Sequence, residues 1–104
     1  MDVRMLTQNL DLDLEQLAAF CERNHIRWLA VFGSALREDF GPDSDVDVLV
    51  EFDPEHIPGY EFITMQDELS RLVGRNVDLV TKKTLNWRLR DRVLDEARVL
   101  YDAA

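Results

Sequence analysis

Two short stretches of the chain carry residue types that could act on a phosphate. Gly33 and Ser34 follow an apolar run; the glycine allows a tight turn, and the serine offers a hydroxyl beside free backbone N–H groups. After ten intervening residues, Asp45 and Asp47 open a second apolar run. On a strand these two carboxylates share one face, with roughly 6–7 Å between their Cα atoms. The pattern predicts a phosphate cradle beside a pair of cation-binding groups.

Paired carboxylates of this kind suit divalent metal ions. In two-metal phosphoryl-transfer sites the ions lie about 3.5–4 Å apart, a spacing that Asp45 and Asp47 could bridge. We therefore expect this face to bind two Mg²⁺ ions, or Mn²⁺ in their place, together with a nucleoside triphosphate such as ATP.

A third carboxylate belongs to Asp78, in the middle of the short apolar run Val77–Val80. An isolated charge in mid-strand is costly unless it faces solvent or a cation. If this run pairs beside the strand that begins at Asp45, Asp78 can join the same face. The alternative is an exposed strand aspartate without a functional role.

Arg37 stands one helical turn beyond the Gly33–Ser34 pair. Its guanidinium could reach the same phosphates, or it could form a surface ion pair with Glu38 or Asp39. Ser34 could also cap a short helix, and this role is compatible with phosphate binding at the helix N-terminus.

Hydrophobic periodicity predicts the elements that must position these residues. Helices are expected at 13–24, 34–39, 62–73 (ended by Gly74) and from Thr84 to about Ala97, and strands at 27–32, 45–52, 77–80 and 98–101. The order predicts an α/β (α+β) fold, in which helices flank a small mixed sheet of three to four strands. Along 45–52 we expect the valines to pack, and the face of Asp45, Asp47, Leu49 and Glu51 to stay open.

Length and composition predict one soluble domain over residues 1–104. A single cysteine, Cys21, fits a reducing cytoplasm and is expected to be a small buried hydrophobe. No apolar run is long enough to span a membrane. The net charge of −9 argues against direct nucleic-acid binding, although residues 82–98 are locally +3 and could be a solvated helix face, a docking surface or part of a triphosphate site.

The remaining candidates have simpler explanations. His25 and His56 lack ligand spacing to a second His or Cys, so we expect structural or exposed roles. Phe62 and Met65 fall on an apolar helical stripe and should be core. Trp28 and Trp87 should also pack, although Trp87 could instead contact a base or a partner.

The chemistry-bearing segments, Val31–Arg37 and Pro42–Val50, resemble the signature of the DNA polymerase beta-like nucleotidyltransferase superfamily. The resemblance is greatest to its minimal nucleotidyltransferase (MNT) branch, and it spans about residues 26–101. Residue types, spacing and flanking strands all agree with it. The resemblance implies metal binding and catalysis by Asp45, Asp47 and Asp78, and nucleotide binding by Gly33, Ser34 and Arg37. The family usually has a small residue after the arginine, where this chain has Glu38.

For the MNT branch the resemblance implies transfer of AMP from ATP to a tyrosine of a partner HEPN ribonuclease, so that the chain acts as the antitoxin of a toxin–antitoxin pair. A chain of this length has little room for an acceptor-binding domain, which favours a macromolecular acceptor. Two alternatives are an antitoxin that neutralises by contact alone and a small-molecule nucleotidyltransferase of the aminoglycoside-modifying type. Homo- or hetero-oligomers are compatible with each.

Overall fold

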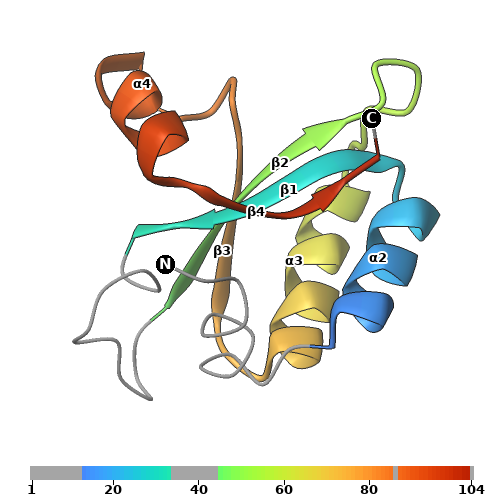
Figure 1. The fold of residues 1–104 in the computed structure, drawn as a ribbon. Coiled ribbons are helices and arrows are strands. Elements are labelled where there is room, and N and C mark those ends of the chain that lie inside the picture. The colour runs from blue at the N-terminus through green and yellow to red at the C-terminus, as the bar shows by residue number, and fades with distance from the viewer. Residues whose placement is uncertain (1–12, 34–44, 86, 104) are drawn as a thin grey trace.

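The computed structural model describes residues 13–33, 45–85 and 87–103 (Figure 1). The elements in chain order are α2 (Leu14–Arg23), β1 (Ile26–Phe32), β2 (Val46–Phe52), α3 (Glu61–Val73), β3 (Val77–Thr81), α4 (Trp87–Glu96) and β4 (Arg98–Asp102). The short helix predicted at 34–39 lies outside the described residues. No described helix is long and apolar enough to cross a membrane.

The four strands form one mixed sheet in the order β3-β2-β1-β4. β1 pairs antiparallel with both β2 and β4, whereas β2 and β3 run parallel. The predicted fold class is therefore confirmed, and so is the pairing of the strand that carries Asp78 beside the strand that carries Asp47.

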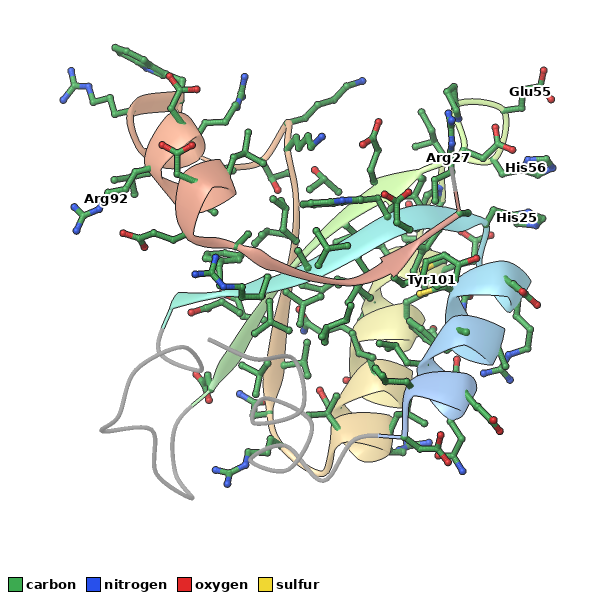
Figure 2. The ribbon with its side chains drawn as sticks, viewed as in Figure 1. His25, Arg27, Glu55, His56, Arg92 and Tyr101 are labelled. Atoms are coloured by element: carbon green, nitrogen blue, oxygen red, sulfur yellow. The ribbon has the colours of Figure 1, made fainter. Side chains whose placement is uncertain are left out.

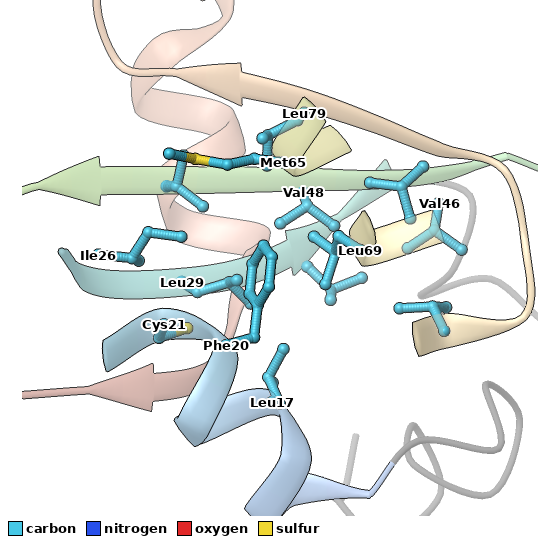
Figure 3. Close-up of a cluster of buried hydrophobic side chains, with 14 of the residues drawn as sticks. Leu17, Phe20, Cys21, Ile26, Leu29, Val46, Val48, Met65, Leu69 and Leu79 are labelled. Carbon is cyan, nitrogen blue, oxygen red and sulfur yellow. The ribbon is translucent and has the colours of Figure 1, made fainter. Parts of the chain in front are cut away.

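Helices α2 and α3 lie next to each other on one face of the sheet and close the hydrophobic core (Figures 1 and 3). Phe20 and Leu17 from α2 and Leu69 and Met65 from α3 pack against the valines of β2. Full burial of a side chain of this size contributes about 1.5–3 kcal/mol. Cys21 is also buried here, as the sequence predicted.

The ends of these two helices follow local rules. Asp13 caps α2, because its side chain accepts a hydrogen bond from the N–H of Glu15. Gly74 ends α3 in the left-handed conformation, with φ of 76°, a region that costs glycine least.

Helix α4 departs from the prediction. Thr84 does not cap it: the Thr84 hydroxyl donates to the carbonyl oxygen of Thr81 and accepts from the Thr81 N–H, which closes a turn after β3. The helix begins at Trp87 instead, and none of its residues is buried. The expectation that Trp87 packs is therefore wrong, since Trp87 is 73% exposed.

Side chains cover the outer edge of β3. The outward N–H groups of Val77 and Leu79 donate to Ser70 Oγ and Gln66 Oε1 of α3, each at 3.0 Å. The Thr81 N–H donates to Thr84 Oγ1, also at 3.0 Å. These contacts hold β3 from the side opposite β2, and so fix the backbone that carries Asp78.

Candidate active site

Asp47 occupies the centre of the predicted carboxylate row. In the sheet it pairs with Phe32 of β1 on one side and with Asp78 of β3 on the other. Neighbouring strands lie about 4.8 Å apart, so the Asp47 and Asp78 backbones are direct neighbours. Asp47 is half-buried, and Asp78 is exposed.

Gly33 follows β1 immediately and lies against Asp47. Its φ of 74° falls in the left-handed region, and a Cβ placed on Gly33 would overlap the Asp47 carboxylate. Backbone conformation and space therefore both require glycine here. A side chain at this position would occupy the room in which the carboxylate lies.

Asp45 precedes β2 and is exposed. Its Oδ1 accepts a hydrogen bond from Asn76 Nδ2 at 3.1 Å. Because Asp45 and Asp47 are two residues apart along the strand direction, their side chains leave the same face. The register thus places the three aspartates that the sequence singled out on one face of the sheet, in a row across the beginnings of β2 and β3.

The donor set of this row fits Mg²⁺. Among the residues that the structure describes, no group of three acidic, histidine or cysteine side chains could hold a metal ion by itself. The carboxylates of this row would therefore need further ligands. Mg²⁺ is usually bound in this way, by one or two carboxylates together with water and substrate phosphates. Ser34 and Arg37, predicted to hold those phosphates, lie outside the described residues.

Further along β2, the same face is less open than predicted. Leu49 is fully buried, and the Glu51 carboxylate accepts a hydrogen bond from Lys82 Nζ at 3.1 Å. Lys82 also lies over the Trp28 ring, 5.0 Å from its centroid. One member of the basic segment 82–98 is therefore used within the fold, and buried Leu49 separates the aspartates from exposed Glu51.

A histidine pair lies at the other end of the molecule (Figure 2). His25, with φ of 58°, stacks on His56 with ring centroids 3.9 Å apart. His56 Nδ1 lies 3.5 Å from Asp53, and the N–H of Glu55 lowers the pKa of the Asp53 carboxyl, with His56 acting in the same direction. Both histidines are exposed, in agreement with the prediction. Their contact with each other was not predicted, because the two residues are far apart in the sequence and their spacing follows no known pattern.

A cavity of about 330 Å³ also lies away from the three aspartates. Its lining comes from the last residues of β2 and β3 and the segments that follow them, including Phe52, Ile57 and Lys83. The carboxylates stand at the beginnings of the same two strands. The cavity is therefore separate from the candidate active site.

The chain belongs to the family described as the nucleotidyltransferase domain, whose family model matches residues 14–100. It is 43% identical over 76 residues to the protein adenylyltransferase MntA of Thermococcus cleftensis, an alignment covering 72% of this chain and 75% of that protein.

Solved structures share this fold. One described as a minimal nucleotidyltransferase has a TM-score of 0.69 and 33% identity, with 94% of this chain and 95% of that chain covered. A second is a chain from a complex of tri-AMPylated Shewanella oneidensis HEPN toxin with MNT antitoxin, with a TM-score of 0.57, 18% identity and coverage of 86% and 69%. At that identity the second likeness concerns the fold alone.

Proposed function

We propose that this chain is a Mg²⁺-dependent adenylyltransferase that moves AMP from ATP to a hydroxyl group of another protein. The observation that carries the proposal is the register of β2 and β3, which sets Asp47 directly beside Asp78 while Gly33 leaves room for the Asp47 carboxylate. Asp45 extends the row by one more carboxylate.

The residues of the row have two roles in the proposed reaction. Asp45 and Asp47 would hold two Mg²⁺ ions, which when bound neutralise charge on the triphosphate and favour attack at the α-phosphorus. Asp78 orients the acceptor hydroxyl and accepts its proton. The acceptor oxygen forms a bond to the α-phosphorus, the bond between that phosphorus and the oxygen bridging to the β-phosphate breaks, and pyrophosphate leaves.

The triphosphate of the nucleotide would lie on the side of Asp47 that faces β1, away from Asp78. The backbone at Gly33 and the hydroxyl of Ser34 would hold the β- and γ-phosphates, with the Arg37 guanidinium as a further ligand. The positive φ of Gly33 supports this arrangement, because it ends the extended backbone of β1 beside Asp47.

We further propose that the acceptor is a tyrosine of a HEPN ribonuclease toxin, which AMP transfer would silence. Two similarities support this partner: the named activity of the MntA relative and the shared fold of the MNT antitoxin complex. The exposed positions of Asp45 and Asp78 also support a protein acceptor, because a protruding tyrosine could reach them from outside.

The test combines the chain with a HEPN ribonuclease toxin, in the presence of Mg²⁺ and ATP. We expect each modified site to gain roughly 329 Da, the mass of an adenylyl group, and ribonuclease activity to fall. The Asp45→Asn/Asp47→Asn double variant should still bind the toxin but leave its mass unchanged. If that variant neutralises the toxin as well as the parent does, contact alone suffices and the adenylyltransferase proposal fails.

A further inference from the structure

Asn76, the last residue before β3, contacts the beginning of β2 twice. Its carbonyl oxygen accepts from the N–H of Val46 at 2.9 Å, and its side-chain amide donates to Asp45 Oδ1 at 3.1 Å. The backbone contact extends the parallel pairing of β2 and β3 and would form with almost any residue at this position. The side-chain contact requires a donor of suitable length, and it reaches a carboxylate of the candidate active site.

We infer that Asn76 is a positioning residue that orients the Asp45 carboxylate for metal binding; this inference rests on the proposed function. Asp45 is exposed, so without a partner of fixed position its side chain would sample several rotamers. A hydrogen bond to Oδ1 restricts that rotation and so limits the directions in which the carboxylate can point. Hydrogen bonds from neighbouring groups orient metal-ligating carboxylates in this way.

The register explains why an amide suits this position. Val46 pairs with Val77 and Asp47 with Asp78, so one step earlier Asp45 faces Asn76. On this face two pairs of residues therefore lie side by side across the strands: Asp45 beside the amide of Asn76, and Asp47 beside Asp78. An acidic residue at position 76 would add a fourth negative charge, whereas a lysine or arginine would form an ion pair with Asp45 and compete with the metal.

The contact can be tested by direct measurement of metal binding, without turnover. Mn²⁺ is titrated into the protein with α,β-methylene-ATP, and free Mn²⁺ is followed by its electron paramagnetic resonance signal. The same titration of the nucleotide without protein is subtracted, because the triphosphate itself binds Mn²⁺. We expect Asn76→Ala to weaken Mn²⁺ binding about tenfold, the lower end of the effect of losing such a partner.

Ser70→Ala is the matched control. It removes the hydrogen-bond partner of Val77, the residue next to Asn76, without touching Asp45. It should lower the melting temperature while keeping the Mn²⁺ affinity of the parent. If Ser70→Ala weakens Mn²⁺ binding as much as Asn76→Ala does, the effect comes from the strand end and the inference is wrong.

Two other outcomes separate this inference from the proposed function. If the parent binds Mn²⁺, Asp47→Asn does not, and Asn76→Ala matches the parent, only the role of Asn76 is overturned. If the parent itself binds no Mn²⁺ with the nucleotide analogue present, the metal-dependent function fails and the role of Asn76 fails with it.

Discussion

The two faces of the sheet differ in what their side chains do. The face covered by α2 and α3 is lined by fully buried groups such as Phe20, Leu29 and Val48. The opposite face carries the aspartates beside buried Leu49, and α4, which follows β3, contributes no buried residue. The difference indicates that folding stability and proposed chemistry depend on largely separate residues, so each can be perturbed without the other.

The largest effect is expected from Asp47→Asn. This change keeps the shape of the side chain but removes the charge at the centre of the row, so AMP transfer should fall by a factor on the order of 10³. Stability should not fall, since one negative charge beside Asp78 is lost. Initial transfer rates and thermal melts measure the two quantities. A variant with both normal folding and near-parent transfer would show that the row is not catalytic.

The second prediction concerns the covered face. Phe20→Ala should lower the free energy of unfolding by about 3–5 kcal/mol, because it removes a fully buried ring from the core. Leu14→Ala is the control in the same helix, where the side chain is 43% exposed, and it should cost much less. Urea denaturation compares the two. If both variants lose a similar free energy of unfolding, α2 does not pack against the sheet through one apolar face.

The third prediction uses pH. Burial raises the pKa of the Cys21 thiol from 9.0 to about 12, with Glu22 adding to the shift, so the folded state keeps a proton that the unfolded chain releases. Stability from this group is therefore complete below pH 9 and declines as the pH rises from 9 towards 12, by about 1 kcal/mol per pH unit. Urea denaturation with reductant at pH 8 and pH 10.5 should show a smaller decline for Cys21→Ala than for the parent.

The smallest change in stability is expected on α4. Leu89 is 48% exposed, so Leu89→Ala should alter the free energy of unfolding by no more than about 0.5 kcal/mol. Trp87→Ala should behave similarly, and a loss of affinity for the acceptor protein would favour the predicted partner contact of Trp87. A loss above about 1 kcal/mol for Leu89→Ala would place this helix in the core and weaken the contrast between the faces.

The sequence predicted most of what lies in strong local patterns. Alternation along β2 and the short run around Asp78 predicted two strands, and their pairing side by side is what the structure shows. Gly74 marked the end of α3 because its glycine suits a left-handed position. The strongly periodic helices α2 and α3 likewise begin and end close to their predicted positions.

The predictions that were wrong or missing depend on contacts between particular residues. Hydrophobic periodicity and local capping rules do not contain those contacts. Thr84 suits a helix cap in isolation, but Thr81 competes for its hydroxyl and closes a turn. Leu49 alternates with the aspartates yet is buried, since burial depends on what covers the far end of the strand. The Asn76–Asp45 contact joins residues 31 positions apart, and only the strand register brings them together.

The covered edge of β3 also limits how the sheet can be extended. An incoming strand pairs through unoccupied backbone donors and acceptors at a sheet edge, which is the route by which many β proteins aggregate. At β3 the N–H groups of Val77, Leu79 and Thr81 already donate to side chains of the same chain. A foreign strand would have to break these hydrogen bonds before forming its own. Templated growth is thus disfavoured at the edge beside the carboxylates.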